Sequence, residues 1–134
     1  MAKLLVVEDN DMNWDMLSRW LRKRGFEMAR AVNGEEAVTM AASEAPALIL
    51  MDMGLPIKDG YQATREIKAN EATRAVPVIA LTANAMAEDE ERAMGAGCDA
   101  YQSKPIDFPQ LLRTMGPLLP EGLPAKAQKF LETH

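Results

Sequence analysis

The chain has 134 residues, 48% of them hydrophobic, a net charge of −5 and a pI near 4.9. This length suits one domain with a real core, and the acidic balance argues against a nucleic-acid surface. No apolar run approaches the roughly 18 residues of a membrane span. The single cysteine, Cys98, excludes an internal disulfide and fits a reducing compartment, so we expect a cytoplasmic protein.

Short apolar runs alternate along the chain with segments of helical periodicity. The apolar runs predict five strands, at residues 3–7, 26–32, 47–51, 76–82 and 99–103. The intervening segments predict five helices, at about residues 12–24, 34–42, 60–70, 85–97 and 106–115. Gly25 ends the first helix, and the capping signals Asn33 with Glu36, Asp59 with Gln62, and Asp107 open three others.

Strands and helices that alternate in this way predict a parallel sheet with helices on both faces. In such a sheet the functional crevice lies beyond the carboxyl ends of the strands. Polar side chains follow four of the five predicted strands: Glu8 and Asp9, then Asp52, then Thr82, then Ser103 and Lys104. We therefore expect three acids, a hydroxyl and a lysine to converge on one rim of the sheet.

Three carboxylates that lie close together repel one another, and a hard divalent cation relieves that repulsion. Magnesium prefers oxygen ligands and commonly takes one or two carboxylates together with phosphate oxygens. The chain has one histidine and one cysteine, which argues against zinc. An aspartate in such a site can act as a nucleophile toward phosphorus, with a lysine and a threonine hydroxyl holding phosphoryl oxygens.

Four segments carry a resemblance to the receiver domain of two-component response regulators: VVEDN (6–10), LILMDMGLPIKDG (48–60), VPVIALTA (76–83) and GCDAYQSKPI (97–106). The resemblance covers roughly residues 3–119 and favours the stand-alone, single-domain type. It implies a flavodoxin-like, doubly wound five-stranded parallel sheet in the order 2-1-3-4-5 with five flanking helices. Residues 1–119 are then the receiver domain, and residues 120–134 are a C-terminal extension, either a short helix or a frayed tail.

The resemblance also implies a role for each residue of the acidic rim. Asp52 would accept a phosphoryl group, Asp9 would bind Mg²⁺ directly, and Glu8 would bind it through a water. The backbone carbonyl of Gly54 would supply a further metal ligand. The protein would then be a phosphoacceptor switch, not an enzyme with an external substrate.

Further residues would hold the phosphoryl group and report its presence. Thr82 and Lys104 would bind phosphoryl oxygens, and the small Ala83 would leave room for the group. Tyr101 would change its rotamer together with Thr82. The Lys104–Pro105 peptide bond would be cis.

The expected partners are a sensor histidine kinase or a histidine phosphotransfer protein, and a downstream protein target. We expect no nucleic acid, no membrane, and a monomer or weak dimer. We expect Asn13 and Trp14 to be partner contacts on the first helix, and the alternative for Trp14 is a half-buried packing residue. Two other readings, a phosphohydrolase of the haloacid dehalogenase class and a degenerate receiver, fit the acid pattern less well.

Three features depart from the family pattern or leave alternatives open. Lys58 stands near the acceptor, where it would bind a partner acid or be solvated. Gly54 and Asn84 occupy positions that tune the rate of dephosphorylation in the family. This combination of residue types predicts neither a fast nor a slow rate, so the lifetime of the phosphoryl group stays open. The extension has two alternatives: it is a frayed terminus, or Phe130 and Leu131 pack on the receiver domain or on a second copy of the chain.

Overall fold

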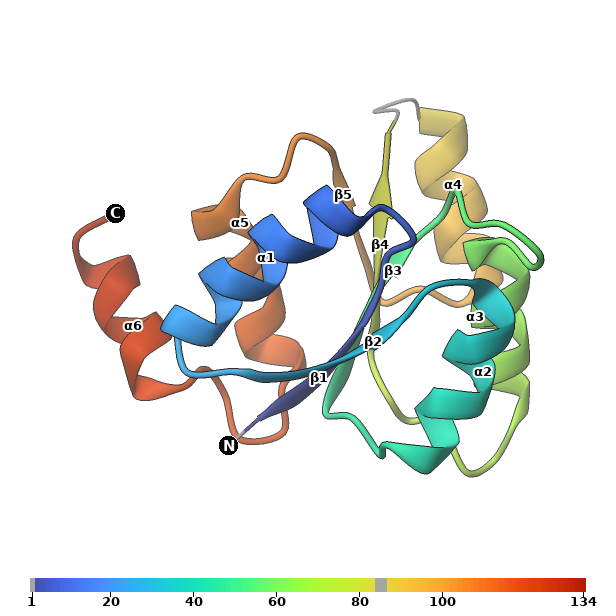
Figure 1. Ribbon diagram of the computed structural model, residues 1–134, viewed down its shortest axis with the longest axis horizontal. Coiled ribbons are helices and arrows are strands. Elements are labelled where there is room, and N and C mark those ends of the chain that lie inside the picture. Colours follow the sequence, from blue (N-terminus) through green and yellow to red (C-terminus); the bar gives the residue numbers. More distant parts are fainter. Residues whose placement is uncertain (1, 84–86) are drawn as a thin grey trace.

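A computed structural model describes residues 2–83 and 87–134 and shows one five-stranded parallel sheet with helices on both faces (Figure 1). The strand order β2-β1-β3-β4-β5 confirms the predicted topology. The strands are β1 (Lys3–Val7), β2 (Glu27–Ala31), β3 (Leu48–Asp52), β4 (Val78–Thr82) and β5 (Ala100–Ser103). The helices are α1 (Asp11–Lys23), α2 (Gly34–Ser43), α3 (Gly60–Ala69), α4 (Ala87–Ala96), α5 (Phe108–Met115) and α6 (Ala125–Glu132), with a 3-10 turn at Gly116–Leu118.

The sheet separates two apolar cores. Helices α1, α5 and α6 cover one face, and α2, α3 and α4 cover the other (Figure 1). Alternate residues of β1 point to opposite sides, so Leu4 and Val6 join the first core while Leu5 and Val7 join the second. Strand β3 is buried along its whole length, as expected of a central parallel strand.

The predicted helix caps are confirmed. The side chains of Asn33, Asp59 and Asp107 accept hydrogen bonds from backbone amides three residues further on, at 2.8, 2.8 and 3.1 Å. Asn10, which was not among the predicted caps, caps α1 in the same way, with 2.9 Å to the Asn13 amide. This cap fixes the point at which the chain leaves β1 and enters α1.

Several element boundaries differ from the predicted ones. Strand β2 begins at Glu27, because the Phe26 amide still donates to the Leu21 carbonyl at the end of α1, at 3.3 Å. Strand β4 begins at Val78, directly after Pro77, whose missing N–H cannot join the ladder. Residues 85 and 86, where we expected α4 to begin, lie outside the described residues, as does Asn84.

The apolar stripe predicted for α1 is only partly buried. Leu17 and Leu21 lie in the core and Trp20 packs against it, whereas Met12 and Met16 are 82% and 54% exposed. Helical spacing alone does not show how far along a helix the core extends. The first two turns of α1 therefore present methionine side chains to solvent.

The C-terminal extension contains helix α6, which packs on the same face as α1 and α5 (Figure 1). Ala127 is fully buried, and Phe130 and Leu131 pack against the core beneath α1 and α5. The Phe130 ring meets Trp20 edge-on at 5.1 Å between centroids, and the Arg24 guanidinium lies 4.3 Å from the Phe130 ring. The helix thus adds an apolar contact that the receiver portion alone lacks.

Replacing Phe130 by alanine should lower the free energy of unfolding by roughly 1–3 kcal/mol, less than for a fully buried phenylalanine. The change removes the ring that packs on Trp20 and against Arg24. Thermal or urea unfolding measures the effect, and Lys129→Ala, an exposed change one residue away, is the control. Equal stability of the two variants would show that the Phe130 ring does not stabilise the fold.

Among the residues that the structure describes, none of the helices is both long enough and apolar enough to cross a membrane.

Candidate functional site

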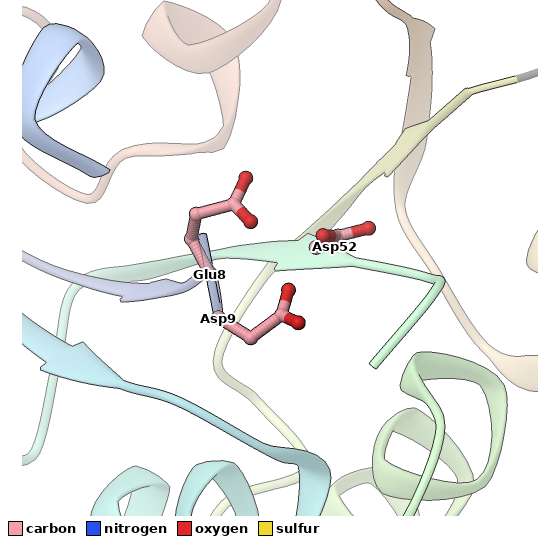
Figure 2. Close-up of side chains that lie close together, drawn as sticks. All are labelled: Glu8, Asp9 and Asp52. Atoms are coloured by element: carbon pink, nitrogen blue, oxygen red, sulfur yellow. The ribbon is translucent and has the colours of Figure 1, made fainter. Parts of the chain in front are cut away.

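The carboxyl ends of β1 and β3 bring three acidic side chains together. Glu8 and Asp9 directly follow β1, and Asp52 is the last residue of β3, the strand that pairs with β1 in parallel. One carboxylate oxygen from each residue lies within 4.8 Å of the other two (Figure 2). Glu8 and Asp52 are buried, whereas Asp9 is exposed. We call these three residues the acid cluster.

Lys104 balances part of this negative charge. Its Nζ lies 3.2 Å from Glu8 Oε1 and 3.5 Å from Asp52 Oδ2. The residue follows β5, where its backbone amide donates to the Thr82 carbonyl at 2.7 Å, and the Lys104–Pro105 peptide bond is cis. Lys104, at the end of the edge strand β5, thus reaches the acid cluster from one side of β3, and Glu8 and Asp9, after β1, reach it from the other.

The charged form of Glu8 remains disfavoured even with Lys104 present. Burial raises the pKa of the Glu8 carboxyl above its usual value, and the Asp52 carboxylate raises it further, against the opposing effects of the Asn10 amide and Lys104. A group whose charged form is disfavoured in this way gains from an additional cation. Three clustered carboxylates offer the oxygen ligands that a hard divalent cation prefers.

A cavity of about 470 Å³ opens beside Asp52. The predicted acceptor Asp52, the predicted metal ligand Gly54 and the three residues predicted to bind the phosphoryl group are among those that line it. These three are Thr82, Ala83 and Lys104. All five residues come from the ends of β3, β4 and β5 and from the loops that follow, so the parallel sheet itself assembles this group. The space is large enough for a small anionic group next to a carboxylate, a hydroxyl and an ammonium.

The far wall of this cavity was not predicted from the sequence. It includes Tyr61 of α3, and Asp89 and Arg92 of α4. The Arg92 guanidinium lies 3.9 Å from the centre of the Tyr61 ring, and burial raises the pKa of the Tyr61 hydroxyl. These residues are far apart in the sequence and carry no local motif, so only the packing of α3 against α4 reveals them.

Close backbone contacts hold the loop between β3 and α3. The Gly54 amide donates to Asp52 Oδ1 at 3.0 Å. A Cβ atom on Gly34 would lie 2.0 Å from the Lys58 carbonyl oxygen, and one on Gly60 would lie 2.5 Å from the Asp52 carbonyl oxygen. The loop therefore lies against the start of α2 at a distance that only glycine permits.

Lys58 forms an ion pair within the chain, which our expectations of a solvated side chain or a partner contact did not include. Its Nζ lies 2.8 Å from the carboxylate of Glu66 on α3, and its side chain is only 26% exposed. Its neighbour Ile57 is 80% exposed and has a positive φ of 67°. The Lys58 side chain thus ties the loop to α3, and Ile57 takes the exposed position of the loop.

The remaining predicted site residues lie nearby. Thr82 ends β4 and Tyr101 lies on the adjacent β5, where it is half-buried against the core under α2, α3 and α4. Asn13 helps to line a separate apolar groove of about 150 Å³, together with Met16, Leu17, Leu81, Pro105 and Ile106. Trp14 does not line that groove, and the guanidinium groups of Arg22 and Arg30 lie 5.9 and 5.5 Å from its ring.

Comparison with known proteins identifies the class to which this fold and site belong. The sequence pattern of the response regulator receiver domain matches residues 4–115. The chain therefore belongs to the response regulator receiver domain family of two-component signalling, as its resemblance indicated. The match leaves out residues 116–134 and with them helix α6.

Individual relatives agree with this assignment. The polar-differentiation response regulator DivK of Brucella anthropi is 42% identical over 112 residues, which is 84% of this chain and 91% of DivK. The receiver domain of the sensor histidine kinase PA1611 of Pseudomonas aeruginosa PAO1, crystallised with a magnesium ion in its active-site cleft, is 41% identical with a TM-score of 0.81. That alignment covers 87% of this chain and 96% of the other.

A chemotaxis protein also shares the fold. CheY4 of Vibrio cholerae is 26% identical to this chain and superimposes with a TM-score of 0.82, covering 89% of this chain and 99% of CheY4.

Proposed function

We propose that this protein is a phosphoacceptor switch whose Asp52 takes a phosphoryl group from a phosphohistidine of a sensor histidine kinase or a histidine phosphotransfer protein. The observation that carries the proposal is the position of Asp52, which belongs to the acid cluster, contacts Lys104 and lines the cavity at the end of β3. Membership of the receiver family supports it independently.

The acid cluster fits a magnesium ion. It offers three carboxylates within 4.8 Å, and the raised pKa of Glu8 indicates that a further cation would relieve the site. Asp9 and Asp52 would hold the ion directly, Glu8 would hold it through a water, and the Gly54 carbonyl would complete the protein ligands. When bound, Mg²⁺ neutralises charge on the phosphoryl oxygens. The PA1611 receiver domain supports this assignment by analogy.

The chemistry is a transfer to the protein itself. An oxygen of the Asp52 carboxylate forms a bond to phosphorus while the bond from phosphorus to the donor's imidazole nitrogen breaks, and the imidazole leaves. Lys104 pairs with a phosphoryl oxygen, and the Thr82 hydroxyl donates to another. Ala83, at the mouth of the cavity, leaves space for the group. Slow hydrolysis of the acyl phosphate returns the free carboxylate.

The output is a change in protein binding. Thr82 and Tyr101 lie on neighbouring strands, so movement of the Thr82 hydroxyl toward a phosphoryl group changes the space beside Tyr101. We assign the phosphodonor to the apolar groove that Asn13 and Met16 line, because it adjoins Glu8 and Lys104. A cytoplasmic location agrees with Cys98, a buried free thiol of the kind that persists in a reducing compartment.

Replacing Asp52 by asparagine tests the proposal, because an amide cannot form the acyl phosphate. Wild type incubated with acetyl phosphate and Mg²⁺ should gain one phosphoryl group by intact mass, and Asp52→Asn should gain none. Asp15→Asn, an exposed change on α1, is the control and should behave as wild type. Equal phosphoryl incorporation in wild type and Asp52→Asn would overturn the assignment.

A further inference from the structure

We propose that Arg30 is a positioning residue that fixes the connection between β1 and α1 and so holds Glu8 and Asp9 in place for the cation. Arg30 lies on β2, outside the acid cluster, and its side chain is 22% exposed. The inference rests on the proposed function, since it concerns the affinity of the same site for Mg²⁺.

Three contacts of one side chain carry the inference. Arg30 Nε donates to the backbone carbonyl of Glu8 at 3.0 Å. Its Nη2 lies 2.9 Å from Asp11 Oδ1, in the first turn of α1. The guanidinium carbon lies over the Trp14 ring, 5.5 Å from its centre, one turn further along the helix. The side chain therefore touches the end of β1, the start of α1 and its second turn at once.

The backbone of Glu8 shows why these contacts matter. Its amide donates to the Ala31 carbonyl of β2 at 3.0 Å, and its carbonyl accepts from Arg30. The backbone amide and carbonyl of Glu8 are thus both hydrogen-bonded to β2, the first to its backbone and the second to the Arg30 side chain. The Glu8 carboxylate in turn accepts from the Asn10 amide at 3.2 Å, so the geometry of the turn and that of the acid are linked.

Positioning and simple charge predict opposite effects of removing Arg30. As a nearby cation, Arg30 disfavours Mg²⁺, so a purely electrostatic role makes the variant bind Mg²⁺ more tightly. As a clamp, it keeps the carboxylates gathered, so its loss weakens binding. Lysine separates the two roles, because it keeps the charge but has no planar fork to bridge Glu8 and Asp11.

The test measures the Mg²⁺ dissociation constant of Arg30→Met, Arg30→Lys and wild type by calorimetry. We expect both variants to bind about tenfold more weakly, the usual cost of losing a group that orients metal ligands. Arg19→Met is the matched control: Arg19 pairs with Asp15 on the exposed side of α1, so its loss should leave the constant unchanged. Amide exchange without Mg²⁺ should be faster at Glu8 and Asn10, whose amides are hydrogen-bonded, in both Arg30 variants than in wild type and Arg19→Met.

The possible outcomes separate this inference from the proposed function. Wild-type affinity in both Arg30 variants, or tighter binding in Arg30→Met, overturns the positioning role while Asp52 still accepts a phosphoryl group. Weak binding in Arg30→Met with normal binding in Arg30→Lys overturns the guanidinium clamp as well, because a single ammonium without a planar fork then suffices. Failure of wild type both to bind Mg²⁺ and to be phosphorylated overturns the proposed function and this inference together.

Discussion

Asp9→Ala should bind Mg²⁺ far more weakly than wild type. Asp9 is the exposed member of the acid cluster, and without it two buried acids remain, both of which already pair with Lys104. Loss of a direct ligand should cost at least the roughly tenfold that loss of an orienting group costs. Titration by calorimetry measures the affinity, and phosphoryl incorporation at a fixed, low Mg²⁺ concentration should fall in parallel.

The control for Asp9→Ala is Asp15→Ala, which removes an exposed carboxylate of α1 outside the acid cluster. Both variants lose one negative charge, so a difference between them reports ligation and not net charge. Equal Mg²⁺ affinity in Asp9→Ala and Asp15→Ala would contradict the placement of the cation.

Lys104→Met should slow phosphoryl incorporation by roughly a hundredfold, the usual cost of removing one group that stabilises transition-state charge. The change removes the ammonium that lies 3.2 Å from Glu8 and 3.5 Å from Asp52. Mg²⁺ binding should become a few-fold tighter in the same variant, because the carboxylates lose a competing cation. Rates with acetyl phosphate and calorimetric titration measure the two effects.

The opposite signs of these two effects make the Lys104 variant informative. A variant that merely unfolds loses both activities, whereas the proposed role separates them. Lys3→Met is the control, since Lys3 pairs with Glu44 at the opposite end of β1. A Lys104→Met protein that is phosphorylated as fast as wild type would remove Lys104 from the phosphoryl site.

The parts of the fold that depend on local sequence could be predicted well. Buried apolar runs and helix caps depend on neighbouring residues, so the five strands and the caps Asn33, Asp59 and Asp107 agree with the structure. The strand order is not a local property, and it was predicted from the resemblance to the receiver family. The rule that parallel strands place their carboxyl ends at one edge was enough to gather Glu8, Asp9 and Asp52 before any distance was known.

Other features depend on contacts between residues far apart in the chain, and sequence patterns do not record them. The pairing of Lys58 with Glu66 and the contact of Arg92 with Tyr61 arise only when helices pack. The same holds for Arg30, which reads as an ordinary strand residue until β2 lies beside β1. Periodicity likewise could not show that Met12 stays exposed, because that depends on where the core beneath α1 ends.

The C-terminal extension illustrates the same limit. Its eight-residue helix is too short to be stable alone in water, so the sequence left a frayed tail and a docked helix both open. Packing of Phe130 on Trp20, and of Trp20 in turn on Phe108 at 4.5 Å, joins α6 to α1 and α5. Tertiary contacts therefore determine the structure of this segment.

Locating the phosphoryl group on the wild-type chain tests the central claim most directly. Phosphorylated protein is treated with borohydride, which reduces an acyl phosphate to an alcohol, and the reduced residue is found by peptide mass spectrometry. We predict a single reduced position at Asp52, dependent on Mg²⁺. Reduction at Asp9 or at any other residue, or no reduction in protein that carries a phosphoryl group, would contradict the proposal that Asp52 is the phosphoacceptor.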